Sequence, residues 1–279
     1  MSDMQRVTKK DPCPICNRPD WCLLGKSVAM CMRVPSPRAK TLSDGSVGYI
    51  HRLDGSTHVA PTPPRPKKEE PVQNWDTLLS GWRSTLGSGI APTYCQRLGL
   101  PVSALACLGA QRAPWHDTVA FPMRNGSNAV VGVRLRNGQG NKWAVTGSHQ
   151  GLFIPQQEMD SAMAFFVEGP TNAAAGLSIG VYTVGRPNNV GGVFDIIALI
   201  NRLKIRKAVI IADTDVDKER PDGSKFNPGA DGACALSAQL TIPNCTLLMP
   251  VKDMRDFVAV GGTKTMLNYM IDQCVWRRP

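Results

Sequence analysis

The second half of the chain alternates short apolar runs with segments of helical periodicity, and this alternation constrains the fold most. The strand candidates are AFFVE (164–168), VYTVG (181–185), AVIIAD (208–213) and TLLMP (246–250). Helices are predicted at 171–180, 193–203, 229–240 and 263–275. This rhythm is typical of a mostly parallel, doubly wound sheet covered by helices. We therefore expect residues 158–279 to form an α/β parallel-sheet domain.

The residues before this domain show a different hydrophobic period. The segment TVAFPMRNGSNAVVGVRLRNGQGNKWAVT (118–146) alternates apolar and polar residues between Asn-Gly turns, which predicts an antiparallel β-meander. Helices are expected from Trp75 to Trp82 and near Pro92–Leu98, so residues 75–157 should form an α+β subdomain. The stretch APTPPRPKKEEP (60–71) contains five prolines and offers little to bury, which indicates an extended linker that we place at 60–74.

Four of the nine cysteines lie close together near the start of the chain. Cys13 and Cys16 form a knuckle in CPIC, and a hairpin folded about Lys26-Ser27 would place Cys22 opposite Cys31. Opposed residues on one face have Cβ atoms about 5 Å apart, so the four thiolates can share one structural Zn²⁺. Residues 1–59 are therefore predicted to be a small β zinc ribbon. His51 is an alternative to Cys22 as the fourth ligand.

Acidic side chains lie at or just beyond the ends of three predicted strands. They are Glu168 at the end of the first, Asp213, Asp215 and Asp217 at the end of the third, and Asp253 and Asp256 after the fourth. The carboxyl ends of parallel strands form the crevice where ligands bind, so these carboxylates should meet there. Hard cations with oxygen ligands, Mg²⁺ or Mn²⁺, would neutralise them. Such a cluster is suited to phosphoryl transfer.

Positive charge is concentrated in the first two thirds of the chain. Residues 1–74 carry 12 basic against 7 acidic side chains and residues 75–155 carry 7 against 2, whereas residues 156–279 have 13 of each. A basic region of this size fits a polyanionic partner such as nucleic acid. A strand would place Arg134 and Arg136 on one face, which is either a phosphate-binding or a solvated face.

Neither a membrane span nor a secretory signal is expected. The sequence has no run of about 18 uncharged apolar residues, the length that a transmembrane helix needs. The first residues, MSDMQRVTKKDPCP, lack an apolar core. The cytoplasm is therefore the expected location, and no membrane partner is predicted.

Several of these motifs together resemble a known family. VEGPTNAAA (167–175), VIIADTDVD (209–217) and KDMRDF (252–257) resemble the signature of the TOPRIM domain of bacterial-type primases and topoisomerases. The meander and GIAPTYCQRLGL (89–100) resemble the basic subdomain that precedes TOPRIM in bacterial and phage primases. With the zinc ribbon, the resemblance covers nearly the whole chain except the linker.

The resemblance implies a DNA primase without a fused helicase. Such an enzyme makes short RNA primers on single-stranded DNA from ribonucleoside triphosphates, by metal-dependent nucleotidyl transfer. A separate replicative helicase would then be a partner, in a bacterial cell or a phage-infected host.

The resemblance also assigns roles by motif position. Glu168 would be a metal ligand or general base, Asp213 and Asp215 would hold the divalent ions, and Asp253 and Asp256 would support them. The basic positions that hold template or nucleotide phosphates are matched by Arg124, Arg134, Arg136 and Lys142. The chain departs from the family at Asn172, where an Asp is common, and this weakens one expected metal contact.

Two other readings of the sequence remain open. A non-enzymatic zinc-finger/TOPRIM recombination mediator would lack the basic subdomain that this chain shows. A TOPRIM nuclease normally carries an ATPase domain, and the sequence has no GxxxxGK[ST] motif. A topoisomerase is not favoured, because the remaining length cannot hold a strand-passage domain.

Overall fold

The computed structural model describes residues 4–42, 47–53, 73–87, 89–157, 162–219 and 225–279. Internal contacts divide the chain into two compact units, Met1–Glu70 and Pro71–Pro279, hereafter unit 1 and unit 2. The linker predicted at 60–74 falls almost entirely outside the described residues. No helix in the described ranges is long and apolar enough to cross a membrane.

Unit 1 is an antiparallel sheet of short strands with the order β1-β2-β3-β5-β4. The strands are β1 Gln5–Arg6, β2 Leu23–Leu24, β3 Val28–Cys31, β4 Ala39–Thr41 and β5 Val47–Arg52. Hairpin β2–β3 pairs Leu23 with Met30 and Leu24 with Ala29, which is the turn predicted about Lys26-Ser27. The predicted small β fold is confirmed.

Unit 2 begins with three helices and a second antiparallel sheet of order β6-β7-β8-β9. The elements are α1 Trp75–Leu86, α2 Pro92–Leu98, α3 Val102–Cys107, β6 Gln111–Arg112, β7 Thr118–Arg124, β8 Val130–Asn137 and β9 Lys142–Ala144. Helix α1 starts where the Asn74 side chain accepts a hydrogen bond from the Thr77 N–H, a standard N-cap. One face of this sheet packs on α1 through Trp75, Leu79 and Leu135, whereas Val119 and Phe121 face the opposite way.

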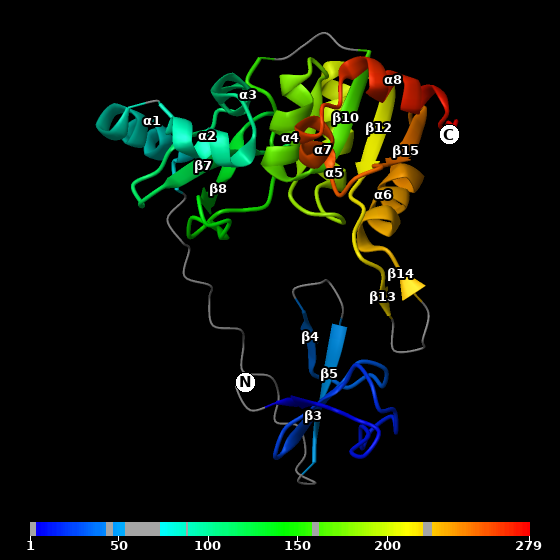
Figure 1. Ribbon diagram of the computed structural model, residues 1–279. Helices are drawn as coiled ribbons and strands as arrows, with labels where there is room; N and C mark the ends of the chain where they lie inside the picture. Colours follow the sequence, from blue (N-terminus) through cyan, green and yellow to red (C-terminus); the bar gives the residue numbers. More distant parts are fainter. Residues whose placement is uncertain (1–3, 43–46, 54–72, 88, 158–161, 220–224) are drawn as a thin grey trace. The chain divides into compact units, whose positions relative to one another are not determined.

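The rest of unit 2 is the expected parallel sheet, with strand order β11-β10-β12-β15. Its strands are β10 Met163–Glu168, β11 Thr183–Arg186, β12 Lys207–Ala212 and β15 Asn244–Leu248. Its helices are α4 Gly169–Ser178, α5 Val193–Leu203, α6 Pro228–Gln239, α7 Met254–Ala259 and α8 Lys264–Asp272. Helices α4, α7 and α8 cover one face and α5 and α6 the other (Figure 1). A short antiparallel pair, β13 Lys218–Glu219 and β14 Lys225–Phe226, precedes α6.

The strand alternation explains the two layers of helices. Phe165 and Val167 of β10 belong to the core under α4 and α7, whereas Ala164 and Phe166 belong to the core under α5 and α6. Because both faces of the strand are buried, its sequence is apolar throughout. The predicted α/β parallel-sheet domain is confirmed.

The two sheets of unit 2 are tied together by residues 152 and 153. Leu152 bridges to Arg124 at the end of β7, and Phe153 bridges to Gly185 in β11. Phe121 and Phe153 also pack edge to face, with ring centroids 6.4 Å apart. These contacts fix the antiparallel sheet beside the carboxyl edge of the parallel sheet.

Candidate functional site

Four cysteines of unit 1 converge on one point. In the CPIC turn, the Asn17 N–H donates to the Cys13 carbonyl over 2.8 Å, and Asn17 takes a left-handed φ of 54°. The β2–β3 register carries Cys22 opposite Cys31, and their Sγ atoms are 4.0 Å apart. The Sγ atoms of Cys13, Cys16, Cys22 and Cys31 all lie within 4.8 Å of one another. Four thiolates at this spacing fit a closed tetrahedral zinc site.

Backbone donors surround these sulfurs. The Val34 and Arg33 N–H groups point at Cys31 Sγ over 3.3 and 3.4 Å, and the Met32 N–H points at Cys22 Sγ over 3.5 Å. Burial opposes ionisation of Cys16, but hydrogen bonds from the Arg18 backbone and the neighbouring thiols outweigh it and lower its pKa to about 7. Donors to sulfur orient thiolate ligands around a metal.

His51, the alternative fourth ligand, lies outside this cluster. Its Nε2 is 3.0 Å from the Val34 carbonyl oxygen, to which it can donate. The geometry therefore favours the four-cysteine ligand set.

Carboxylates gather at the carboxyl edge of the parallel sheet. Glu168 is the last residue of β10, and Asp213 and Asp215 follow directly after β12. Asp253 caps α7, where its carboxylate accepts a hydrogen bond from the Asp256 N–H over 2.9 Å. One oxygen of Asp253 is thereby committed to holding the helix end.

The negative charges of these carboxylates raise one another's pKa values. Burial raises the pKa of Asp213 to about 7, and the negative charges of Glu168, Asp253 and Asp215 add to the shift. Burial also raises the pKa of Glu168, with a further contribution from Asp215. Hard oxygen donors that repel one another in this way fit a divalent cation such as Mg²⁺. Within the described ranges, however, no three carboxylates converge as the four thiols do.

The side chain of Asn172, in α4, contacts two other segments at this edge. Its Nδ2 lies 3.5 Å from Asp213 Oδ1, and its Oδ1 accepts a hydrogen bond from the Arg255 N–H over 3.2 Å. The amide thus links α4, the end of β12 and α7, whereas an aspartate there would place another negative charge beside Asp213.

Arg186 is a member of the site that the sequence analysis missed. It ends β11, pairs in register with Glu168, and is only 2 % exposed. Its Nη1 donates to the Asn189 carbonyl over 3.0 Å, and its positive charge opposes the upward pKa shifts of both Glu168 and Asp213. A buried cation beside these carboxylates offsets part of their repulsion. The one available signal was an arginine directly after an apolar strand.

A basic face lies on the antiparallel sheet beside Glu168. Arg136 pairs in register with Lys142, and Arg136 Nη1 donates to Thr171 Oγ1 at the start of α4 over 3.0 Å. Burial lowers the pKa values of Arg134 and Lys142, and the charge of Glu168 counteracts both shifts. The structure therefore brings these three cations and the carboxylate edge together.

Three other predicted residues are placed differently. Arg124 pairs with Val130 on the α1 side of the sheet, and its Nη1 donates to the Asn128 carbonyl over 2.9 Å. Asp256 points at Arg255, with an N–O distance of 3.4 Å. Asp217 is exposed and accepts a hydrogen bond from Asn227 Nδ2 over 3.2 Å.

Together, a four-cysteine cluster, a basic antiparallel sheet and a parallel sheet with acidic strand ends define a zinc ribbon joined to a TOPRIM-type core. No family model matches the chain, and no curated protein matches it. Solved structures share the fold, and DnaG primase catalytic cores are among them.

Three of these structures illustrate the likeness. An E. coli primase catalytic core is 15 % identical, with a TM-score of 0.56 over 72 % of this chain and 79 % of that chain. A DnaG primase catalytic domain bound to single-stranded DNA is 17 % identical, with a TM-score of 0.56 over 72 % and 77 %. The zinc-binding and RNA polymerase domains of Aquifex aeolicus primase are 14 % identical, with a TM-score of 0.54 over 72 % and 60 %. At these identities the likeness establishes the fold.

Proposed function

We propose that the protein is a DNA primase that synthesises short RNA primers on a single-stranded DNA template. The observation that carries this proposal is the placement of Glu168, Asp213 and Asp215 beside the Arg134, Arg136 and Lys142 face. Carboxylates that can hold divalent ions, next to cations that can hold phosphates, are what nucleotidyl transfer requires. The fold is shared with DnaG primase cores, one of which was solved with single-stranded DNA.

Each part of the site then has a role. Glu168, Asp213 and Asp215 would hold Mg²⁺ or Mn²⁺, which when bound neutralises triphosphate charge. Glu168 can also accept the proton of the attacking 3′-hydroxyl, since burial raises its pKa. Asp253 positions α7 and Asp256 lies one turn along it. Arg134, Arg136 and Lys142 would bind template or nucleotide phosphates.

The remaining features complete the proposal. One structural Zn²⁺ per chain would be held by the four cysteines of unit 1. A separate replicative helicase would open the duplex, in the cytoplasm of a bacterial cell or a phage-infected host. Arg124 would bind a template or nucleotide phosphate outside the face formed by Arg134, Arg136 and Lys142.

The test is primer synthesis on single-stranded DNA with labelled ribonucleoside triphosphates. Asp213→Asn, Asp215→Asn and Glu168→Gln should each reduce incorporation at least ~100-fold, and activity should require Mg²⁺ or Mn²⁺. Asp217→Asn, an exposed aspartate in the same loop, is the matched control and should change incorporation less than about twofold. Wild-type protein that binds single-stranded DNA but incorporates no nucleotide, even with its helicase, would favour the recombination-mediator reading instead.

A further inference from the structure

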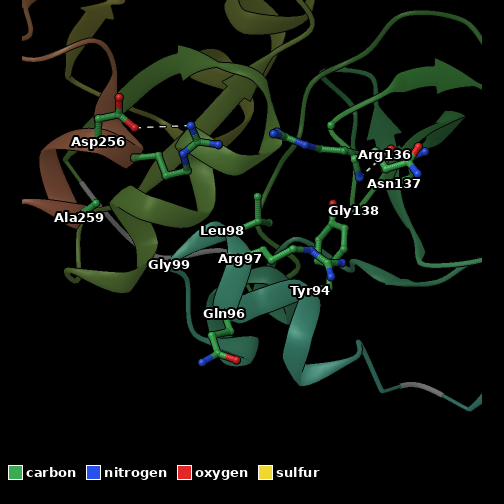
Figure 2. Close-up of a pocket in the computed structure, with 13 residues that line it drawn as sticks. Tyr94, Gln96, Arg97, Leu98, Gly99, Arg136, Asn137, Gly138, Asp256 and Ala259 are labelled. Atoms are coloured by element: carbon green, nitrogen blue, oxygen red, sulfur yellow. Dashed lines mark hydrogen bonds and ion pairs between the residues drawn. The ribbon is translucent and has the colours of Figure 1, made fainter.

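The carboxylates at the carboxyl edge of the parallel sheet are held in place in different ways. Glu168 is the last residue of β10, so the hydrogen bonds of the sheet fix its backbone. Asp253 caps α7, and the same helix carries Asp256 in its first turn (Figure 2). Asp215, by contrast, lies within residues 213–217, which belong to no helix or strand. Its position therefore depends on contacts from other segments.

Asn227, immediately before α6, contacts this loop. Its side-chain Nδ2 donates to the Asp215 carbonyl over 2.6 Å and to Asp217 Oδ1 over 3.2 Å. Its Oδ1 accepts a hydrogen bond from the Ala230 N–H over 3.0 Å, which makes the same residue the N-cap of α6. One amide thus joins the first turn of a twelve-residue helix to the backbone of Asp215.

Helix α6 is a firm anchor for this contact. Its Ala233 is buried in the core under α5 and α6. At the start of the helix, the Pro228 carbonyl accepts a hydrogen bond over 3.1 Å from Nδ2 of Asn189, in the loop after β11. A Cβ at Gly229 would lie 2.2 Å from the Asp213 carbonyl oxygen, so the first turn of α6 packs directly against the loop that carries Asp215. Such close packing leaves the loop little room to move relative to the helix.

A second segment, the one that follows β15, holds the same loop. The Thr214 N–H donates to the Lys252 carbonyl over 2.7 Å, and the Thr214 hydroxyl donates to the Met249 carbonyl over 2.7 Å. Thr214 is therefore fixed by the chain after β15, and the next residue, Asp215, is fixed by Asn227. These contacts order a stretch of backbone that has no regular structure of its own.

We propose that Asn227 is a positioning residue for the divalent-ion site, where its amide fixes the backbone of Asp215 before an ion binds. The inference rests on the proposed function, in which Asp213 and Asp215 hold Mg²⁺ or Mn²⁺. Partners that orient metal ligands without touching the metal commonly change its affinity roughly 10–100-fold. An amide suits this task because it donates to one segment and accepts from another, whereas an ionised carboxylate only accepts.

Asn227→Ser tests this role, because serine caps a helix about as well as asparagine but has no amide that donates to Asp215. The full chain is titrated with Mn²⁺ without DNA or nucleotide, and free Mn²⁺ is measured by electron paramagnetic resonance. Asn227→Ser should weaken Mn²⁺ binding about tenfold. Its melting temperature without metal should stay within about 3 °C of the wild type, because the cap is kept. Asp215→Asn, which removes the ligand itself, should weaken Mn²⁺ binding at least as much.

The matched control is Asn74→Ser. Asn74 caps α1 through the same kind of hydrogen bond, from the Thr77 N–H over 3.0 Å, and α1 packs on the antiparallel sheet. This substitution should change Mn²⁺ affinity less than about twofold. Equal losses for the two Asn→Ser variants would attribute the effect to helix capping and overturn the proposal. If Asn227→Ser does not fold, Asn227→Thr, which also keeps a capping hydroxyl, takes its place.

The remaining outcomes separate this inference from the proposed function. If Asn227→Ser binds Mn²⁺ like the wild type while Asp215→Asn does not, Asn227 is only a helix cap, and the metal site proposed for primer synthesis stands. If the wild type binds no Mn²⁺, or Asp215→Asn binds it unchanged, Asp215 holds no ion. Both the role of Asn227 and the metal role of Asp215 are then wrong. Neither result depends on whether the protein makes primers.

Discussion

At the scale of single residues, Asp213 is the carboxylate of the parallel-sheet edge whose negative charge is most unfavourable in the folded state. Its pKa rises to about 7, first through burial and then through the charges of Glu168, Asp253 and Asp215. An unfolded aspartate titrates near about pH 4. Between these values the folded state retains a proton that the unfolded state has lost, so the free energy of unfolding falls as pH rises. Above about pH 7 the ionised carboxylate weakens the metal-free fold.

Asp213→Asn should therefore stabilise the metal-free protein. At pH 8 in EDTA we expect a gain of about 1–3 kcal/mol and a melting temperature several degrees higher, because the buried charge is removed. The gain should shrink as pH approaches 4, and Mg²⁺ should narrow it by stabilising the wild type. Thermal melts of both proteins with Asp217→Asn as control would test this. A variant that melts below the wild type at pH 8 would show that the folded protein stabilises the negative charge of Asp213.

At the scale of elements, predictability followed length. The helix predicted at 193–203 coincides with α5, because three turns give a clear apolar period. Helices α3 and α7 have six residues each, too few to show a period, and both were missed. Strand-end carboxylates were predictable because β10 and β12 are continuously apolar. Arg186 was missed because a single arginine after an apolar strand is not a distinctive pattern, and Arg255 was missed because it lies in α7.

Gly126 connects the β7–β8 turn to helix α5. Its N–H donates to Asp195 Oδ1 over 3.0 Å, and its carbonyl accepts from Arg202 Nε over 2.9 Å. A Cβ at this position would lie 2.5 Å from the Asp195 carbonyl and collide with Ala198. The basic sheet is therefore docked on α5 through a contact that only glycine permits.

Gly126→Ala should lower the free energy of unfolding by about 1–3 kcal/mol, because backbone atoms must move to admit the methyl group. Gly81→Ala is the matched control: Gly81 lies within α1 with nothing near its absent side chain, so alanine should add about 0.5–1 kcal/mol. Urea denaturation of both variants would measure the two effects. If Gly126→Ala were as stabilising as Gly81→Ala, the β7–β8 turn would be free to move on α5.

The face formed by Arg134, Arg136 and Lys142 should dominate binding to single-stranded DNA. Arg136→Ala and Lys142→Ala should each weaken binding and reduce the slope of log K against log salt by about 0.7, because each cation displaces counterions from one phosphate. Arg206→Ala, whose side chain is exposed elsewhere in unit 2, should leave the slope unchanged. Fluorescence anisotropy at several salt concentrations would measure the slopes. Wild-type affinity that does not change with salt would indicate a merely solvated face.

At the scale of the whole molecule, the two units rest on different kinds of core. Unit 2 has apolar layers on both faces of its parallel sheet. In the described part of unit 1, the buried cluster around the thiols consists of Val7, Cys13, Cys22 and Cys31. Small domains bury too little apolar surface to fold alone, and a metal ion commonly supplies the missing stability. Unit 1 is therefore expected to depend on zinc, and unit 2 is not.

Cys31→Ser tests whether unit 1 depends on zinc while unit 2 does not. The substitution removes a buried thiolate that accepts the Arg33 and Val34 N–H groups, and the three remaining thiolates no longer close a tetrahedral site. Zinc measured by mass spectrometry should fall from about one ion per chain to near zero. Hydrogen exchange should lose protection across the β3–β5 pairing while the β10–β12 pairing in unit 2 keeps its protection. Cys107→Ser, an exposed cysteine of unit 2, should change neither measurement. Freshly purified wild-type protein without zinc, or a Cys31→Ser variant with β3–β5 still protected, would mean that unit 1 folds through its apolar contacts alone.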